Sequence, residues 1–459
     1  MQEPAHAAAR SAAFATNANA APWAGRRLHF VGIGGAGMSG LALLAARLGA
    51  SVSGSDRAPS RYLERLRQAG IEPAIGHDRA NVPPGAEIVY STAVPADNPE
   101  RAAARAAGAR ELHRAQLLAQ IAALKRCLAV TGTHGKTTTS GMLVQILKGC
   151  GMDPAYLVGG ELISTGANAG WGEGEWIVVE ADESDRSLLE LSPEIAVLTS
   201  AELDHHTTYA SLEQLRATLA EFMAQAGSRA VVWDRAELRA LCPGGGVPYD
   251  AHDVRLDERG ARFRWRGLEV RLSVPGRHNA LNAAGALTAA ALAGAEPARA
   301  VRALAGYVGA RRRFELLGRT HSGALVYDDY AHHPTEVAAT IAAARSRVRG
   351  RLVAVFQPHL YSRTRALAAE FGAALASADL CAVLDVYGAR ERPEDFPGVS
   401  GLEIARHAAE AAGGRTVAWL PRFAQARAFL ADTLREGDLC LVMGAGDVDA
   451  LGRLLVEGG

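Results

Sequence analysis

A short glycine loop at residues 132–138 carries the residue types that bind phosphate. Its spacing, Gly-x-x-Gly-Lys-Thr, begins at Gly132. The loop follows an apolar stretch, 127–130, that is typical of a buried strand, and it precedes a helical pattern of apolar residues. Between a strand and a helix, backbone N–H groups surround an anion, Lys136 reaches the terminal phosphates and the Thr137 hydroxyl can bind Mg²⁺. The sequence therefore predicts a nucleotide-phosphate site here.

The loop departs from the standard phosphate-binding spacing, because Val130 stands where that pattern has its first glycine. A chance glycine turn is the alternative. The lysine favours the functional interpretation, since the chain has only three lysines, Lys125, Lys136 and Lys148, among 49 basic residues. A lysine gives a compact positive charge on a phosphate, which arginine does not reproduce. We expect Lys136 to be exposed in its loop.

A second glycine pattern lies nearer the start of the chain. Gly32, Gly34 and Gly37 satisfy Gly-x-Gly-x-x-Gly after a predicted strand at 27–31, and Asp56 ends the next predicted strand. This is the fingerprint of a dinucleotide-binding turn. By itself it predicts a phosphorylated nucleotide at a helix N-terminus and does not specify NAD.

Acidic residues follow two apolar stretches downstream of the phosphate loop. The first stretch ends in Glu180 and runs into an acidic cluster at 182–185, and the second leads to Asp204 and His205. The carboxyl ends of parallel strands share one edge of a sheet, so these side chains are expected near the phosphates. Carboxylates and an imidazole there predict Mg²⁺ beside ATP. A solvated surface charge is the alternative for any one acid.

Polar residues also mark two later places in the chain. Asn279 and Asn282 share one face of an alanine-rich helix, where they can contact a base or, alternatively, cap the helix. Further on, predicted strands end in segments 328–335 and 357–365, which are rich in His, Arg, Tyr and Asp. That set suits an anionic small molecule such as an amino acid, with Arg363 as the fork for its carboxylate.

Composition excludes several classes of protein. Lys plus Arg equals Asp plus Glu at 49 each, and this zero net charge argues against nucleic-acid binding and against a membrane-surface protein. The five cysteines are far apart and mostly in apolar surroundings, so we expect reduced thiols and no disulfides. Residues 1–25 lack the apolar core of a signal peptide and are expected to be a disordered tail. The apolar stretch at 280–293 is too weakly hydrophobic to span a membrane.

Strand and helix patterns alternate from about residue 26 to the end, which predicts an α/β fold with mainly parallel sheets. A length of 459 residues fits two to four domains. The expected division has a tail at 1–25 and domains at 26–124, 125–316 and 317–459. The first and last domains are expected to be Rossmann-like, and the central one to be a P-loop-type ATPase domain.

The motifs together resemble the Mur ligase family, over about residues 26–455. In the family's order the chain carries HFVGIGGAGMSG, TGTHGKTTT, EADESD, DH, GRHNALNA, RRRFE, DDYAHHPTE, FQPHLYSRTR and GAGDV. Each motif is modest alone, and the ordered set is very specific. The resemblance implies one domain for a UDP-sugar, a central ATPase domain and a C-terminal domain for the incoming amino acid.

The resemblance also assigns site residues by their positions in the motifs. The ATP phosphates would be held by Gly132, Thr133, His134, Gly135, Lys136, Thr137 and Thr138. The rest of the nucleotide site would comprise His278, Asn279, Asn282 and Arg313. The catalytic residues would be Lys136, Glu180 and His205, and the metal ligands Thr137, Glu180 and His205. The UDP-sugar would contact Gly32, Gly34, Gly35, Ala36, Gly37, Met38, Ser39, Asp56, Ser91, Thr92 and Ala93. The amino acid would be surrounded by Tyr330, His332, His359 and Arg363.

The motif wording is similar to the alanine-adding branch of the family. That likeness implies a cytoplasmic, ATP- and Mg²⁺- (or Mn²⁺-) dependent ligase in peptidoglycan synthesis, acting on UDP-N-acetylmuramate and L-alanine as a monomer or weak homodimer. Ser200 and Leu360 depart from the residues common in relatives, and Leu360 removes an arginine that some use. No lysine follows Lys148, so this chain cannot use the carbamylated lysine of several other members.

Three alternatives stay open at this point. A related ligase that adds a preformed peptide has a less similar first glycine loop. A nicotinamide dehydrogenase would explain the loop at 32–37 and leave the loop at 132–138 without a role. A non-catalytic nucleotide-binding regulator would not need the polar cluster at the C-terminal strand ends.

Overall fold

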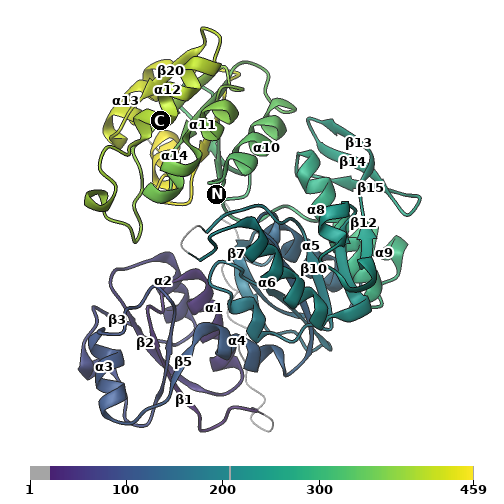
Figure 1. Ribbon diagram of the computed structural model, residues 1–459, viewed down its shortest axis with the longest axis vertical. Helices are drawn as coiled ribbons and strands as arrows, with labels where there is room; N and C mark the ends of the chain where they lie inside the picture. The colour runs from purple at the N-terminus through teal and green to yellow at the C-terminus, as the bar shows by residue number, and fades with distance from the viewer. Residues whose placement is uncertain (1–20, 206–207, 458–459) are drawn as a thin grey trace, which may run out of the picture.

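The computed structural model describes residues 21–205 and 208–457 and divides them into three α/β bodies (Figure 1). The expected tail at 1–25 lies mostly outside the described residues. Residues 21–25 form a turn in which Trp23 packs on the core and its backbone N–H donates to Leu48 O. These five residues therefore belong with the first domain.

The first domain is a parallel five-stranded sheet in the order β3-β2-β1-β4-β5. Its strands are β1 (Arg27–Val31), β2 (Ser51–Asp56), β3 (Ala74–Ile75), β4 (Glu87–Tyr90) and β5 (Glu111–His113). Its helices are α1 (Ala36–Arg47), α2 (Arg61–Gln68), α3 (Pro99–Ala106) and α4 (Arg114–Ala122). Strand β1 lies at the centre, in register with β2 at Arg27 and Ser51, and the glycine loop follows its carboxyl end.

The central domain is a seven-stranded sheet in the order β12-β11-β10-β6-β9-β7-β8, parallel except where β8 pairs with β7. Its strands are β6 (Arg126–Thr131), β7 (Ala155–Leu162), β8 (Ala167–Gly170), β9 (Trp176–Glu180), β10 (Ile195–Leu198), β11 (Ala230–Trp233) and β12 (Val247–Tyr249). Its helices are α5 (Lys136–Gly149), α6 (Leu212–Gln225), α7 (Ala236–Arg239), α8 (Arg277–Leu292) and α9 (Pro297–Leu304).

Alternation along β6 explains why both faces of this sheet are covered. Cys127 and Ala129 point into the core shared with α6 and the first domain, and Leu128 and Val130 point into the core under α5 and α8. A strand buried on both faces reads as a continuous apolar run, which is why its position was predictable.

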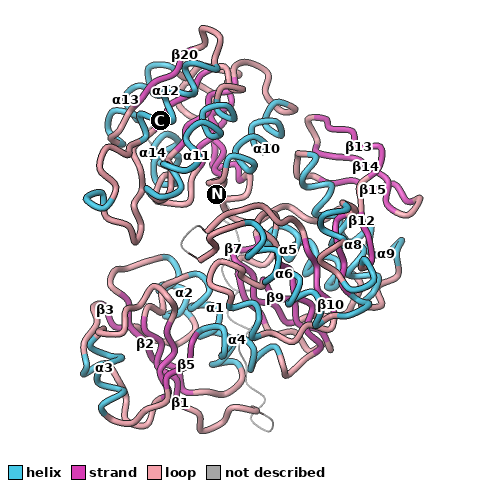
Figure 2. The backbone as a smooth tube through the Cα atoms, in the orientation of Figure 1, coloured by secondary structure: helices cyan, strands magenta, loops and turns pink. Residues whose placement is uncertain are grey.

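A small antiparallel sheet, not expected from the sequence, extends the central domain (Figure 2). It consists of β13 (His252–Asp257), β14 (Gly260–Trp265) and β15 (Leu268–Leu272). Arg266 and Gly267 both have positive φ, at 48° and 80°, as a two-residue hairpin turn requires. The alternation of Phe263 and Trp265 with arginines is the signal that could have revealed it.

The C-terminal domain is a six-stranded sheet in the order β16-β17-β21-β18-β19-β20, in which only β16 is antiparallel to its neighbour. Its strands are β16 (Glu315–Arg319), β17 (Leu325–Asp329), β18 (Leu352–Phe356), β19 (Leu380–Val383), β20 (Thr416–Trp419) and β21 (Leu439–Met443). Its helices are α10 (Pro334–Arg345), α11 (Tyr361–Leu375), α12 (Gly401–Ala411), α13 (Phe423–Thr433) and α14 (Asp449–Glu457). The expected domain break after residue 316 falls inside β16, so the break is better placed before Glu315.

The mainly parallel α/β fold in three domains confirms the fold class predicted from the sequence. None of the described helices is long and apolar enough to cross a membrane. All five cysteines are unpaired thiols, and Cys150 alone among them is not buried.

Candidate active site

The phosphate loop connects β6 to α5, and its two glycines cannot be replaced without strain. Gly132 has a φ of +122° and Gly135 a φ of +80°. A Cβ on Gly132 would lie 2.4 Å from Thr199 Oγ1, and a Cβ on Gly135 would lie 2.4 Å from Asn282 Oδ1. The spacing predicted from the sequence therefore corresponds to a tight turn at the amino end of a helix.

Lys136 is held by a buried carboxylate, so its expected exposure is wrong. Its Nζ donates to Gly132 O at 2.7 Å and lies 2.9 Å from Oε2 of Glu183, which is fully buried. Burial alone would lower the pKa of Lys136, but Glu183, Asp182 and Glu180 together hold it well above its usual value. The lysine is therefore fully charged where phosphate is expected.

Thr137 and Glu180, two of the predicted metal ligands, lie together beside the loop. Thr137 Oγ1 donates to Glu180 Oε1 at 3.1 Å, and Gly159 N donates to Glu180 Oε2 at 2.7 Å. His205, the third predicted ligand, instead places Nε2 3.3 Å from Glu183 Oε1. Hydroxyl and carboxylate oxygens at this spacing suit a hard dication, so the residues present fit Mg²⁺.

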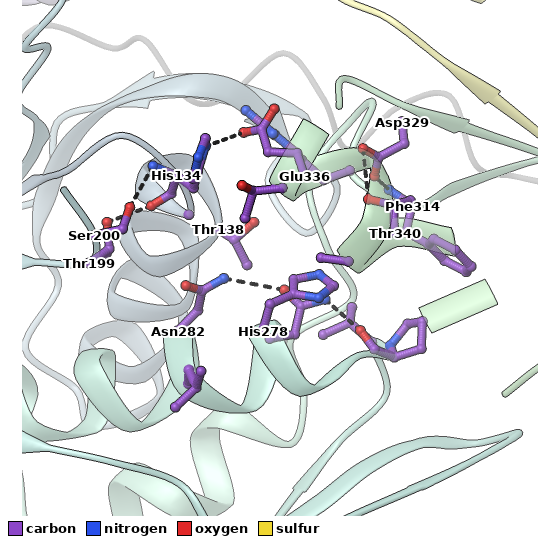
Figure 3. Close-up of a pocket in the computed structure, with 18 of the residues that line it drawn as sticks. His134, Thr138, Thr199, Ser200, His278, Asn282, Phe314, Asp329, Glu336 and Thr340 are labelled. Atoms are coloured by element: carbon purple, nitrogen blue, oxygen red, sulfur yellow. Dashed lines mark hydrogen bonds and ion pairs between the residues drawn. The ribbon is translucent and has the colours of Figure 1, made fainter. Parts of the chain in front are cut away.

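A cavity of about 250 Å³ opens between α8, the phosphate loop and α10 (Figure 3). His278, Asn279 and Asn282 line it, as expected for a nucleotide site. Thr138 and the apolar side chain of Phe314 also line it. Asn279 Nδ2 donates to Pro275 O at 2.6 Å, which is not the bond of a helix cap. Burial lowers the pKa of His278 to about 4, so its imidazole is neutral at pH 7.

A second cavity, of about 550 Å³, is lined by all three domains. Ala36 and Gly37 reach it from the first domain, Lys136 and His205 from the central domain, and Tyr330 from the C-terminal domain. Gly135, Arg313 and Glu336 line both cavities, so the two spaces adjoin at the phosphate loop.

The first glycine loop is held by hydrogen bonds from its own domain and from the central one. Asp56 Oδ2 accepts from Gly34 N at 2.8 Å, and Asn168 Nδ2 of the central domain donates to Ala36 O at 2.6 Å. Gly32 has a φ of +78°. Other residues predicted for the UDP-sugar lie outside the lining of the three-domain cavity: Gly32, Gly34, Gly35, Met38, Ser39, Asp56, Ser91, Thr92 and Ala93.

The predicted amino-acid cluster divides into two parts. Tyr330 and His332 line the three-domain cavity, whereas His359 and Arg363 do not. His332 Nδ1 donates to Tyr330 O at 2.8 Å, which leaves Nε2 with its lone pair. Burial lowers the pKa of His332 to about 4 and that of His359 to about 3.

Arg363 does not present a free fork in this structure. Its Nε and Nη2 donate to Asp204 at 2.9–3.1 Å, and its Nη1 donates to His359 O at 3.2 Å. Both side chains of the Arg363–Asp204 pair are 4% exposed. The pair joins the C-terminal domain to the central one, and Arg363 holds the pKa of Asp204 well below its usual range, although burial opposes this.

Several acids of the site were absent from the predicted set. Glu183 holds Lys136, Glu202 accepts from His134, and Glu336 lies 3.2 Å from His134 Nδ1. Arg114 reaches across from the first domain to Asp182 at 2.8 Å. The acidic motif at 180–185 was visible in the sequence, but the long-range partners of its members were not.

Family models match all three domains in order. "Mur ligase family, catalytic domain" matches residues 27–126, "Mur ligase middle domain" matches 130–290, and "Mur ligase, glutamate ligase domain" matches 312–446. The fold has these three domains in this order, and the phosphate loop lies where they meet. The chain therefore belongs to the Mur ligase family.

Within the family, the chain is similar to ligases that act with alanine. The UDP-N-acetylmuramate–L-alanine ligase of Mycobacterium sp. strain JLS is 47% identical over 465 residues, covering 94% of each chain. The crystal structure of the UDP-N-acetylmuramate–alanine ligase of Thermotoga maritima is 28% identical, with a TM-score of 0.81, over 94% of this chain and 98% of that one. A murein peptide ligase of Psychrobacter arcticus is 25% identical, with a TM-score of 0.71, over the same shares.

Proposed function

We propose that the protein uses ATP to join L-alanine to the lactyl carboxylate of UDP-N-acetylmuramate, giving ADP and phosphate, in the cytoplasmic stage of peptidoglycan synthesis. The observation that carries this proposal is the three-domain cavity, which adjoins the cavity lined by His278, Asn279 and Asn282 at the phosphate loop. A ligase must bring a nucleotide, an acid and an amine to one point, and this arrangement provides one domain for each. The named relatives at 44–47% identity support the choice of acid and amine.

The chemistry follows from the charges around the loop. A lactyl carboxylate oxygen attacks the γ-phosphorus of ATP, ADP leaves, and an acyl phosphate forms. The amine of alanine then attacks the acyl carbon, phosphate leaves, and the amine loses a proton to solvent or to a nearby base. Lys136 stabilises the charge that builds up between two anions, which is where such a site gains most of its rate.

Thr137 and Glu180 would hold Mg²⁺, and His205 would approach it after moving away from Glu183. When bound, the ion neutralises the phosphate oxygens. His332 is neutral and lines the cavity in which the amine of alanine would arrive. Its Nε2 can accept a hydrogen bond from that amine and so orient the amine.

Phosphate release tests the proposal directly. We expect release from ATP only when UDP-N-acetylmuramate, L-alanine and Mg²⁺ (or Mn²⁺) are all present. A preformed peptide in place of alanine tests the alternative raised by the murein peptide ligase of Psychrobacter arcticus. Faster turnover with the peptide than with alanine would overturn the proposed acceptor.

Metal dependence tests the assigned ligands. We expect Glu180→Gln to raise the Mg²⁺ concentration for half-maximal rate about tenfold or more, because one charged oxygen is lost. His205→Ala should raise it less, since His205 lies on Glu183 in the described state. A matched control is Glu173→Gln, an exposed acid of the same domain. Unchanged metal dependence in both site variants would show that the ion binds elsewhere.

A further inference from the structure

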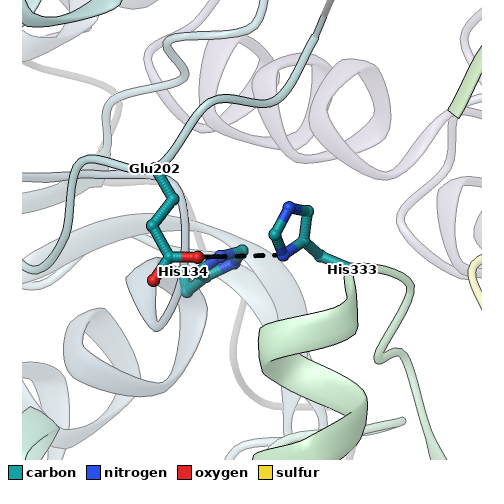
Figure 4. Close-up of side chains that lie close together, drawn as sticks. All are labelled: His134, Glu202 and His333. Atoms are coloured by element: carbon teal, nitrogen blue, oxygen red, sulfur yellow. Dashed lines mark hydrogen bonds and ion pairs between the residues drawn. The ribbon is translucent and has the colours of Figure 1, made fainter. Parts of the chain in front are cut away.

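His134, Glu202 and His333 bring three ligand-type side chains together where the central and C-terminal domains meet (Figure 4). Within residues 21–205 and 208–457 they form the one group of three or more His, Cys, Asp or Glu side chains close enough to share an ion. We propose that this group binds a transition-metal dication of the zinc class, at a site separate from the Mg²⁺ site proposed at Thr137 and Glu180.

The distances between the ligand atoms suit such an ion. Tetrahedral bonds of about 2.0–2.1 Å place ligand atoms about 3.4 Å apart. Here His134 Nε2 lies 3.3 Å from Glu202 Oε2, and His333 Nδ1 lies 3.9 Å from the same oxygen. All the ligand atoms lie within 4.8 Å of one another, so closing around an ion needs side-chain movements of under about 1 Å. Two imidazoles and one carboxylate leave a fourth position for water.

The surrounding hydrogen bonds orient these side chains as metal ligands are usually oriented. His134 Nδ1 lies 3.2 Å from Glu336 Oε1, and its Nε2 donates to Glu202 Oε2 at 3.3 Å, so an ion that binds Nε2 must displace that proton while Glu336 holds the proton on Nδ1. Thr335 Oγ1 donates to Glu202 Oε2 at 2.6 Å and fixes that carboxylate. A carboxylate behind the histidine and a hydroxyl on the carboxylate are the supporting contacts that metal sites require.

His333 can give up its present bond at little cost. It caps the N-terminus of α10, where Nδ1 accepts from Thr335 N over a long 3.4 Å. Its lone pair is therefore already on Nδ1, the nitrogen that faces Glu202. The side chain is 8% exposed, whereas Glu202 is 43% exposed and leaves an opening for an ion to enter.

The charge and the ligand types select the kind of ion. Glu202 supplies a carboxylate to the group, and the carboxylate of Glu336 lies behind His134, so two acidic side chains surround two imidazoles. Imidazole nitrogen favours zinc-like ions over Mg²⁺, which takes oxygen ligands. The alternative is that the group is only a hydrogen-bonded ion cluster.

An ion here would have a mechanical effect. His134 belongs to the phosphate loop and His333 to the first turn of α10, so one ion would tie the loop to the C-terminal domain. His134 and Glu202 also line the nucleotide cavity, so the ion would sit at its wall.

Metal content of the nucleotide-free, full-length enzyme tests the proposal. After chelation and re-equilibration with Zn²⁺ in excess Mg²⁺, we expect the wild type to retain one more Zn²⁺ than His333→Asn. Asparagine keeps a helix cap but is a poor ligand for zinc, so α10 should remain folded. The matched control is His252→Asn, an exposed histidine of β13, which should retain as much Zn²⁺ as the wild type.

Two further readouts distinguish a site from adventitious binding. Co²⁺ should give the intense visible bands of tetrahedral coordination in the wild type and not in His333→Asn. Zn²⁺ should raise the Tm of the wild type and leave that of Glu202→Gln unchanged, because an ion that binds only the folded state stabilises it. Equal Zn²⁺ content in the wild type and His333→Asn would overturn the proposal. None of these measurements requires turnover, so they stand or fall independently of the ligase activity.

Discussion

At the scale of single residues, the positive charge of Lys136 is already paired with a carboxylate in this structure. Glu183 lies 2.9 Å from its Nζ, and His205 contacts the same carboxylate. A nucleotide phosphate must therefore compete with Glu183 for the lysine. The pair keeps a buried cation satisfied until the substrate arrives.

Replacing Lys136 by alanine should lower the turnover rate about a hundredfold or more, because the charge that stabilises the transferring phosphate is lost. The variant should also lose stability, since Glu183 is left buried without its cation. The steady-state rate and the urea midpoint measure the two effects. In the double variant with Glu183→Gln the stability should recover and the rate should not. A rate within a few-fold of wild type would contradict the assignment of the loop.

Asp328 predicts a pH dependence of stability. It is fully buried at the end of β17, and burial raises its pKa from 3.8 to about 7, against the opposing charge of Arg312 at 3.2 Å. The folded state therefore keeps a proton that the unfolded chain loses above about pH 4. The stabilisation that the folded protein gains from protonated Asp328 is therefore complete below about pH 4 and is lost as the pH rises through 7.

Between pH 5 and 8, the wild type should lose about 2–3 kcal/mol of unfolding free energy relative to Asp328→Asn, since one pKa unit is worth about 1.4 kcal/mol. Urea unfolding of both proteins across that range measures the difference. A constant difference at all pH values would show that Asp328 does not titrate there.

At the scale of elements, both glycine loops follow the central strand of a sheet and open a helix. In the phosphate loop, space as well as backbone conformation requires glycine, because Asn282 of α8 lies where a Cβ would be. The loop is thereby packed directly on the helix that lines the nucleotide cavity.

Gly135→Ala should weaken ATP binding more than it weakens the fold. The positive φ alone costs about 1–2 kcal/mol, and the clash with Asn282 must move either the loop or α8. Gly108→Ala is the matched control, since Gly108 has a φ of +70° with nothing within 4 Å of the added Cβ. We expect similar melting temperatures for the two variants and a weaker ATP Kd only for Gly135→Ala, measured by calorimetry. Equal ATP affinity in both would argue against the packing of the loop on α8.

Local pattern was enough to predict the strands and loops of this chain and not enough to predict their partners. The sheet-centre strands β1 and β6, the glycine loops and the acid ending β9 were all read correctly, because a buried parallel strand and its following turn are encoded by neighbouring residues. Glu183 could not be chosen over Asp182, and Arg363 could not be matched to Asp204, because those choices depend on contacts between segments 47 and 159 residues apart.

At the scale of the whole molecule, charged pairs fasten the outer domains to the central one. Arg114 reaches Asp182, Arg65 reaches Glu161, and Arg363 reaches Asp204. Only the last is fully removed from water. Removing one partner of this pair should therefore cost the most, because the other charge would stay buried without a partner, whereas surface pairs are worth little.

Arg363→Lys should raise the apparent KM for alanine strongly and those for ATP and the UDP-sugar little. A lysine cannot keep the two-pronged contact with Asp204 and would loosen the C-terminal domain that presents Tyr330 and His332. If closing of the C-terminal domain over the substrates limits turnover, a loosened domain should also lower kcat. The three KM values from initial-rate kinetics measure the effect.

Asp204→Asn tells direct binding from positioning. If Arg363 acts through the pair, the double variant should be no worse than either single one, with a coupling energy of about 0.5–3 kcal/mol. Additive losses would mean that Arg363 contacts the amino acid itself. An ATP KM that rises as much as the alanine KM would assign Arg363 to the nucleotide site.

Because the chain has only three lysines, the sites at which an amine-specific reagent modifies this enzyme are few and easily assigned. All three ε-amines, those of Lys125, Lys136 and Lys148, belong to the central domain, so an amine-acylating reagent can mark neither outer domain except at the chain's α-amino group. Lys125 lies over Trp171 and Lys148 over Tyr156, and neither lines the nucleotide cavity or the three-domain cavity, whereas Lys136 lines the three-domain cavity. Because Glu183 keeps Lys136 protonated, Lys125 and Lys148 should be the lysines that react, and an additional adduct at Lys136 in the intact mass would report that its contact with Glu183 had been lost, without any engineered label.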